Sequence, residues 1–447
     1  LRHSFMCMRA ILFVMAALAA MTLQAKDIDT KMATMTPEKI NAEMMKDGHK
    51  VVMVGNGESA SEDSVRRMID MFYVDQFHHF QDPLAPYFLL MSRDATLAMG
   101  VGGAVRMRGW ADFDGAIPAN GFAPYLIPVP SSPTMRRRIG GTPGGTSIFF
   151  RVIGTNTAVK DFNAYIQCDF SGIDDVGFKL KKAYVTIQDW TVGYATSTFA
   201  DPAAEAPTID GAGANGKATR TSMLVRWMHS FNPRWSMAAS VEMPSSHVDA
   251  DGVKTRRLYD WMPDYVAFGQ YTWSHEQHIR LAGILRTIPY RDLVAGTNRA
   301  LIGWGAQLSG IIRPVIPLAL YAEVNGGRGY SSYMGDLSIG NYDLVAEPST
   351  PGRMYAPWAM GVNVGAKYNF RYNVYLCAVY GHARYFSDHA TLMPDDYHCG
   401  NYYAANIFWD ITPRLQVGAE YLRGERRNFS GEHGTANRVD ILFQFAF

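Results

Sequence analysis

The chain has 447 residues with a formal net charge of +1, and 48% of its residues are hydrophobic and 13% aromatic. A charge this close to zero supplies no basic surface for nucleic acid, which argues against a nucleic-acid-binding protein. Beyond residue 25, no apolar stretch approaches the roughly 20 residues that a spanning helix needs, which excludes an α-helical membrane protein. Of the 4 cysteines, Cys7 lies in the first segment, and the odd number that remains predicts unpaired thiols.

The first 25 residues have the pattern of a secretory signal peptide. Arg2 and Arg9 precede an apolar run at residues 10–21, and Ala25 ends the segment. A basic region, a short apolar core and a small residue at the cleavage point are typical of such signals. The alternative is an uncleaved anchor, which the shortness of the apolar run disfavours. We therefore expect residues 1–25 to be a signal peptide.

Residues 26–94 lack the alternation of barrel strands and predict a lead-in segment that is partly helical. A proline in the first turn indicates a short helix near Thr36, and residues 51–54 form a brief extended run. A second helix is expected to start near Ser59 or Ser61 and to end at Asp82. Its apolar residues recur at roughly helical spacing: Val65, Met68, Ile69, Phe72 and Phe80. This helix either packs on its own barrel or trimerises, and the sequence leaves both arrangements open.

From residue 95 to residue 447, segments in which apolar and polar residues alternate are separated by turns. Alternation with a period of two is the pattern of a strand with one apolar face. The expected strands lie near residues 99–112, 148–153, 162–170, 179–188, 191–199, 220–231, 235–243, 265–273, 279–288, 301–310, 316–324, 358–368, 374–386, 402–411, 415–423 and 438–447. They number about sixteen, which is even and within the range of bacterial outer-membrane barrels.

The final segment shows the alternation most clearly. Val439, Ile441, Phe443, Phe445 and Phe447 share one parity, and the residues between them are more mixed. An apolar parity that faces lipid and a mixed parity that faces a lumen are typical of transmembrane β-strands. An aromatic carboxyl end is typical of the strand that closes an outer-membrane barrel.

The connections between the expected strands alternate in length. Short ones are expected at residues 232–233, 274–277, 313–314, 369–372 and 412–413, and long ones at 114–144, 201–219, 244–262, 326–357, 387–401 and 424–435. Short periplasmic turns opposite long extracellular loops characterise outer-membrane barrels. The sequence therefore predicts an all-β fold: a closed antiparallel transmembrane β-barrel of about 16 strands over residues 95–447, with a short N-terminal periplasmic helical segment.

Several strands carry charged residues on the parity opposite their apolar stripe. A charge facing lipid near the bilayer midplane would cost about 2–4 kcal/mol, so these side chains are expected to face a lumen. The pore-lining candidates are Arg106, Arg108, Arg151, Lys182, Arg220, Arg226, Arg280, Arg286, Asp169, Glu242 and Glu323. Two interpretations remain open: a balanced salt-bridge network that keeps the wall rigid, or a basic strip that attracts anions.

The long connection at residues 201–217 follows the fifth expected strand and is therefore the third extracellular loop. It is rich in Ala, Gly and Pro, and its charged residues are the constriction-loop candidates Asp201, Glu205, Asp210 and Lys217. In many sixteen-stranded porins the third loop folds inward and narrows the channel. A loop on the outer surface is the alternative.

Three stretches carry a resemblance to a known family. Residues 178–185 read FKLKKAYV, residues 197–202 read STFADP, and GAEY at 418–421 is followed by GER at 424–426. They resemble the basic strand, the entry to the constriction loop and the penultimate strand of the DcaP-like porins. The resemblance implies a trimer of sixteen-stranded barrels that passes small solutes, with a leaning to negatively charged ones such as dicarboxylates.

The leading interpretation is a porin in the outer membrane of a Gram-negative bacterium, with its N-terminal segment in the periplasm. It would pass small hydrophilic solutes by passive diffusion, with outer-membrane lipid and a homotrimer as partners and no nucleic acid. No cofactor or metal is expected, because no Cys/His cluster has metal-ligand spacing. A structural or adhesive barrel with a plugged lumen is the alternative. A hydrolase is less favoured, because no motif places a serine beside a histidine and an orienting acid.

Overall fold

The computed structural model describes residues 50–55, 60–74, 88–156, 160–172, 176–274, 277–387 and 393–447. The expected signal peptide lies outside these residues. So do the helix expected near Thr36 and the expected end of the second helix at Asp82. None of the helices in the described part of the chain combines the length and the apolar character that a transmembrane helix requires.

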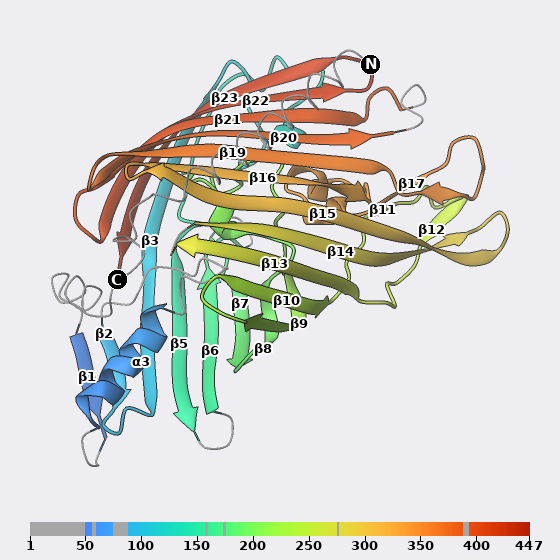
Figure 1. The fold of residues 1–447 in the computed structure, drawn as a ribbon. Coiled ribbons are helices and arrows are strands. Elements are labelled where there is room, and N and C mark those ends of the chain that lie inside the picture. Colours follow the sequence, from blue (N-terminus) through green and yellow to red (C-terminus); the bar gives the residue numbers. More distant parts are fainter. Residues whose placement is uncertain are drawn as a thin grey trace.

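Sixteen strands of the described residues form a closed antiparallel β-barrel (Figure 1). In chain order they are β3 (Leu97–Phe113), β5 (Ser147–Asn156), β6 (Lys160–Asp169), β7 (Lys179–Ile187), β8 (Trp190–Thr196), β9 (Thr221–Ser230), β10 (Trp235–Glu242), β13 (Asp264–Ser274), β14 (Gln277–Asp292), β15 (Thr297–Val315), β16 (Leu318–Arg328), β19 (Trp358–Arg371), β20 (Val374–Phe386), β21 (Tyr397–Asp410), β22 (Leu415–Asn428) and β23 (His433–Ala446). The last strand, β23, pairs with the first, β3, from Asn437 opposite Phe113 to Ala446 opposite Ala104. The predicted fold class is confirmed.

The alternation of side chains explains why these segments form barrel strands. On β14, Leu281 and Leu285 point outward and are exposed, whereas Arg280 and Arg286 point inward and are buried. Each strand's backbone groups bond to its neighbours, because lipid supplies no hydrogen-bond partners. A register slip of one residue would exchange the two faces and expose each arginine to lipid, at a cost of about 2–4 kcal/mol near the midplane.

The lead-in residues form a small unit beside the first barrel strand (Figure 1). β1 (Lys50–Val54) pairs in parallel with β2 (Phe88–Ser92), and β2 pairs antiparallel with β3. Between β1 and β2 in the chain lies α3 (Glu62–Val74). Shorter elements complete the fold: β4 (Arg138–Thr142), β11 (Val248–Asp249), β12 (Thr255–Arg257), β17 (Leu344–Ala346), β18 (Met354–Tyr355), η3 (Pro124–Leu126), η5 (Pro202–Ala204), η6 (Ser331–Tyr333) and η7 (Asp336–Ile339).

Helix α3 packs on its own barrel. Met68 and Phe72 of the helix are buried in one cluster with Ala98 of β3 and Ile153 of β5. Arg151 of β5 donates a hydrogen bond to the carbonyl oxygen of Phe72 at 2.9 Å. The structure therefore shows the packing of α3 on its own barrel, and trimerisation of this segment stays a prediction.

The connections are short at one end of the barrel and mostly long at the other. At the short-turn end, two residues each join β7 to β8, β15 to β16 and β19 to β20. At the long-loop end, residues 114–146, 197–220, 243–263 and 329–357 join successive barrel strands. The alternation of short and long connections that the sequence predicts therefore corresponds to the two ends of the barrel.

One expected long loop, residues 424–435, is wrong. β22 continues to Asn428 and β23 begins at His433, so residues 429–432 alone connect the two strands. The apolar stripe of β22 ends where Arg423 and Glu425 replace it, and this change suggested a loop. The backbone ladder continues beyond that point, because strand pairing depends on backbone hydrogen bonds and does not require an apolar face.

The carboxyl-terminal residue completes the closure of the barrel. The backbone N–H of Phe447 donates to the oxygen of Gly103 at 2.9 Å, and the N–H of Gly103 donates to the oxygen of Phe447 at 3.0 Å. Deleting Phe447 removes both bonds at the seam. We expect the deletion to lower the yield of folded barrel in the membrane more than it lowers the unfolding midpoint of barrel that has formed.

The yield is measured as the heat-modifiable fraction on gels, and the midpoint by urea titration. Phe370→Ala is the matched control, since Phe370 is an exposed aromatic residue near the same rim, away from the seam. Equal yields for the deletion and the parent chain would show that the seam tolerates the loss.

Candidate functional site

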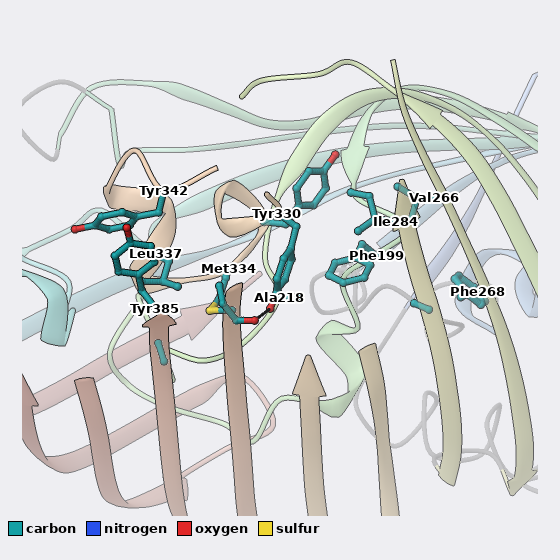
Figure 2. Close-up of a cluster of buried hydrophobic side chains, with 14 of the residues drawn as sticks. Phe199, Ala218, Val266, Phe268, Ile284, Tyr330, Met334, Leu337, Tyr342 and Tyr385 are labelled. Carbon is teal, nitrogen blue, oxygen red and sulfur yellow. Dashed lines mark hydrogen bonds between the residues drawn. The ribbon is translucent and has the colours of Figure 1, made fainter. Parts of the chain in front are cut away.

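The interior of the barrel is the candidate site, and at least three chain segments fold into it. One of them is residues 116–129 with η3, whose Phe122 and Ile127 are buried against the wall. The other two carry most of the contacts described below. The first inward segment, residues 197–219, lies in the connection from β8 to β9 and contains η5. The second inward segment, residues 329–346, follows β16 and contains η6, η7 and β17. Figure 2 shows Phe199 of the first segment and Tyr330 of the second beside Ile284 of β14, and all three belong to one buried cluster. The two segments therefore pack on the inner wall and on each other.

A buried carboxylate anchors the entry of the first inward segment. Asp201 is 0% exposed. His278 Nε2 lies 2.9 Å from its Oδ2, and Ser309 Oγ donates to the same oxygen at 2.6 Å. Arg280 Nη1 lies 3.4 Å from the other carboxylate oxygen. Side chains of β14 and β15 thus hold the segment where it leaves β8.

From this anchor, the first inward segment reaches the strands at the seam. Glu420 of β22 accepts hydrogen bonds from the backbone N–H groups of Ile209 (3.0 Å) and Asp210 (2.7 Å). Arg108 of β3 donates to Asp210 Oδ1 at 2.8 Å, and Arg106 donates to the carbonyl oxygen of Ile209 at 2.8 Å. The segment therefore runs inside the barrel from β14 to β3 rather than over its outer surface.

The last part of the first inward segment, which leads back to β9, lies close against the wall. Asn325 of β16 donates to the oxygen of Gly216 at 2.8 Å, and Asn215 donates to the oxygen of Gly400 on β21 at 3.0 Å. A Cβ at Gly216 would lie 2.2 Å from the carbonyl oxygen of His382. Only glycine can approach the backbone of β20 this closely, so residue 216 is constrained by packing.

Arg286 holds the second inward segment in place. Its Nε donates to Asp264 of β13 at 3.1 Å, and its Nη1 donates to Asp343 at 3.0 Å. Tyr333 of the same segment donates to Asp264 at 2.8 Å, and the guanidinium carbon of Arg220 lies 4.3 Å from the centre of the Tyr333 ring. Both arginines are therefore engaged by the segment and by the wall.

Most of the predicted pore-lining residues are buried. Relative exposure is 8% or lower for Arg108, Arg151, Arg226, Arg280, Arg286, Asp169, Glu242 and Glu323. These side chains stand on the interior parity but are largely shielded from solvent. The physical reason is that the inward segments cover much of the wall, while α3 covers Arg151. For the buried pairs, the salt-bridge interpretation describes what the structure shows.

Solvent reaches inward cations on β3 and β7. Arg106 is only partly buried, and the side chain of Lys181 is 44% exposed, with Nζ 3.1 Å from Asp169 Oδ2. Lys182 is partly buried and shares the parity of Tyr184, whose ring contacts that of a buried inward tyrosine. Lys182 therefore points inward, which the sequence left ambiguous.

A β-bulge explains why the sequence analysis missed Lys181. The register of β6 and β7 shifts between Gln167 and Cys168, so that Lys182 stands opposite Gln167 and Leu180 opposite Cys168. A bulge places an extra residue in one strand and breaks the strict alternation of faces. Lys181, on the strand between Leu180 and Lys182, can then reach the inward Asp169, which simple parity does not predict.

The acids of the interior are less accessible than these cations. Asp201, Asp210, Glu420 and Asp440 are 0–3% exposed. On the first inward segment, Lys217 Nζ lies 2.7 Å from Glu205 Oε2, and these two side chains are 13% and 24% exposed. Where solvent meets the inner faces of β3 and β7, cations therefore predominate.

Burial changes the charge state of groups on the inward segments. Asp336 accepts hydrogen bonds from Asn215 Nδ2 (3.1 Å) and from the N–H of Tyr125 (3.0 Å), and burial raises its pKa to about 7. For Lys217, burial disfavours the charged form, but the adjacent Glu205 outweighs this effect and raises the pKa. Lys217 is therefore charged at neutral pH, whereas Asp336 is protonated in part of the molecules.

The chain shares its fold with solved outer-membrane channels. The outer membrane channel DcaP of Acinetobacter baumannii matches with a TM-score of 0.69 and 19% identity, over 79% of this chain and 98% of that chain. An anion-selective porin from Comamonas acidovorans matches with a TM-score of 0.51 and 10% identity, over 78% and 100%. No protein-family model matches the chain, and no curated protein does. The resemblance to DcaP-like porins is confirmed at the level of the fold.

Removing the anchor of the first inward segment should destabilise the barrel. Asp201→Ala leaves Arg280 buried without this carboxylate, and breaking a buried pair in this way costs about 3–5 kcal/mol. The free energy of unfolding in urea, with the protein in detergent micelles, measures the loss. Asp189→Ala is the control: Asp189 pairs with His229 at 2.8 Å, but both side chains are at least 40% exposed, so its loss should cost less than about 1 kcal/mol. Equal losses would contradict the anchoring role.

Proposed function

We propose that the chain is an outer-membrane porin that lets small hydrophilic solutes diffuse passively. The observation that carries this proposal is the closed sixteen-strand barrel, apolar outside, with a charged interior that inward segments narrow. The shared fold with DcaP, which is described as an outer membrane channel, supports it. In a planar bilayer, the purified protein should give discrete current steps. Folded protein that gives none would contradict the proposal.

The proposal includes a location and an assembly. A closed barrel with long loops at one rim suits the outer membrane of a Gram-negative bacterium, with the short-turn rim toward the periplasm. Residues 26–94 would then lie in the periplasm, after removal of residues 1–25, and residues 95–447 would form the barrel in contact with lipid. The resemblance to the DcaP-like porins further supports a homotrimer.

A preference for anions is the finer part of the proposal. Arg106, Lys181 and Lys182 are inward cations that solvent reaches, while the interior acids are buried. Cations that line a water-filled path raise the local concentration of anions. The Comamonas acidovorans porin is described as anion-selective, and this description agrees with the proposed preference. Dicarboxylates are one class of solute that such a path would favour.

A structural or adhesive barrel with a plugged lumen is the second candidate function. The burial of Arg280 and Arg286 beneath the inward segments favours it. A conductance measurement decides between a channel and a plugged barrel.

A hydrolase receives less support: Ser309 and His278 both bind Asp201, which stands between them. In this arrangement the carboxylate fixes a loop, whereas a nucleophilic serine needs the histidine beside it as a base. Release of fatty acid from lipid by the pure protein would support a hydrolase instead.

Neutralising Lys181 and Lys182 of β7 should weaken anion preference. For Lys181→Gln with Lys182→Gln, the anion-to-cation permeability ratio should fall about two- to fivefold at 0.1 M salt, since two charges near the path act through water and partial screening. Reversal potentials in a KCl gradient measure this ratio. Lys254→Gln with Arg257→Gln, in the long-loop connection between β10 and β13, is the control and should leave it unchanged. A ratio equal to that of the parent would support a wall whose charges only balance each other.

Deleting residues 201–217 should raise single-channel conductance. The backbone N–H of Ser197 donates to the oxygen of Arg220 at 2.9 Å, and Thr196 stands opposite Thr221. The strand ends therefore lie close enough for a short connection. Without the segment, more of the interior is open to water and ions. Deleting the exposed residues 251–254 is the control. A folded deletion variant that conducts like the parent would show that this segment does not limit the channel.

A further inference from the structure

The outward face of β20–β23 carries a row of polar residues at the long-loop rim. Strand register places four residues side by side: Arg384, Cys399, Arg427 and His433. The next row toward the membrane is His382, Asn401, Glu425 and Thr435. We call the first row the rim row. It contains two arginines and one histidine and no acid.

The rim row stands on the parity that faces lipid lower on the same strands. Ala383, Gly400 and Gly434, its neighbours along the chain, are buried inside the barrel. The row below these two still carries Arg423, beside Tyr403, and only below it do the outward residues turn apolar, with Ile407 and Ile441 exposed. The same outward surface is therefore apolar in the membrane and cationic at its long-loop edge.

The position of the rim row matches the edge of a bilayer. Val374 pairs with Trp409, and ten residues further along β20, Arg384 pairs with Cys399. At about 3.4 Å per residue and a tilt of about 40°, this stretch rises roughly 26 Å along the membrane normal. The apolar band of an outer-membrane barrel is about 25 Å tall. With Trp409 at the lower aromatic girdle, the rim row therefore lies at the level of the headgroups.

A groove accompanies the row. It has a volume of about 370 Å³ and is lined by Cys399, Asn401, Arg423, Glu425, Arg426, Arg427, His433 and Thr435. Arg384 does not line the groove but stands beside it, opposite Cys399. Arg384 and Arg427 flank the small Cys399 at a distance of two strand spacings, about 10 Å. The long arginine side chains can converge above the thiol on one anion, which a bulky residue at position 399 would prevent.

The two flanking arginines lack acidic partners within the described residues. Arg423 lies 3.1 Å from Glu425, which leaves that acid occupied, and Asn401 also donates to Glu425 at 3.3 Å. No carboxylate of the described residues lies within ion-pair distance of Arg384 or Arg427. The groove therefore presents excess positive charge to whatever occupies it.

We propose that the rim row binds phosphate groups of a phosphorylated lipid in the leaflet next to the long loops. Arginine binds phosphate through two parallel charge-assisted hydrogen bonds. Basic residues at the membrane surface also attract anionic lipid. A lipid headgroup, rather than a dissolved anion, fits because the row faces outward at headgroup level, directly above lipid-facing side chains. This site is separate from the proposed channel, since it lies on the other side of the wall.

The test compares lipid binding to purified full-length protein in a zwitterionic detergent by native mass spectrometry. The probe is bisphosphorylated lipid A, with the same lipid after removal of both phosphates as its reference. Arg384→Gln with Arg427→Gln should weaken lipid A binding about thirtyfold, as expected for two surface cations that each contribute about fivefold. The parent protein should prefer the phosphorylated lipid by a similar factor, and this preference should fall as salt rises.

Arg256→Gln with Arg291→Gln is the matched control. These two arginines stand opposite each other on β12 and β14, on the outward parity near the same rim and several strands from β20–β23. It should bind lipid A like the parent, and all variants should keep the heat-modifiable mobility of folded barrel and the parent's conductance. Equal binding by the double variant or by the dephosphorylated lipid would overturn the proposal. Displacement of the lipid by inorganic phosphate at equal concentration would overturn it as well, because the site would then serve a dissolved anion. The two-lipid comparison on the parent decides the matter even if a variant fails to fold.

Discussion

The absence of hydrogen-bond partners in lipid is the constraint on which the rest of this structure depends. Every backbone N–H and C=O group of a spanning strand must be paired by another strand, so an antiparallel sheet in a membrane has to close. Here β23 closes on β3, and the final residue, Phe447, completes the seam with bonds to Gly103. Closure then divides every strand into a lipid face and an interior face, and this division assigns each charged residue to one side.

Charges that cannot face lipid have to be satisfied inside, and the inward segments supply many of the partners. Asp201 comes from one segment and meets Arg280, and Asp343 comes from the other and meets Arg286. Each pair joins a wall strand to a segment that fills the barrel. Breaking such a buried pair costs more than breaking an exposed one. The interior charges therefore hold the inward segments in place, while Arg106 and Lys181 remain more accessible to solvent.

Fold and strand positions could be predicted from the sequence because the lipid face imposes a strict period of two. That signal weakens wherever the lipid constraint ends. Beyond Tyr421, Arg423 and Glu425 continue β22 without an apolar stripe, and the sequence wrongly predicts a loop there. At the bulge opposite Gln167, the alternation breaks and Lys181 was missed. The second inward segment was not recognised either, although Tyr330 and Tyr333 are unusual residues for an exposed loop and are both buried.

The contacts of inward-facing side chains could not be predicted from the sequence, for a different reason. Parity shows that Arg280 points inward. Whether its guanidinium contacts water or a carboxylate depends on where residue 201 lies, and no local sequence pattern contains that information.

The central claim is that the inward segments leave a path for small hydrophilic solutes. Swelling of liposomes that contain the unmodified protein, in a series of sugars of increasing size, tests it most directly. The account predicts rapid swelling with the smallest sugars and a steep fall with size, and folded protein that admits none of them would contradict it.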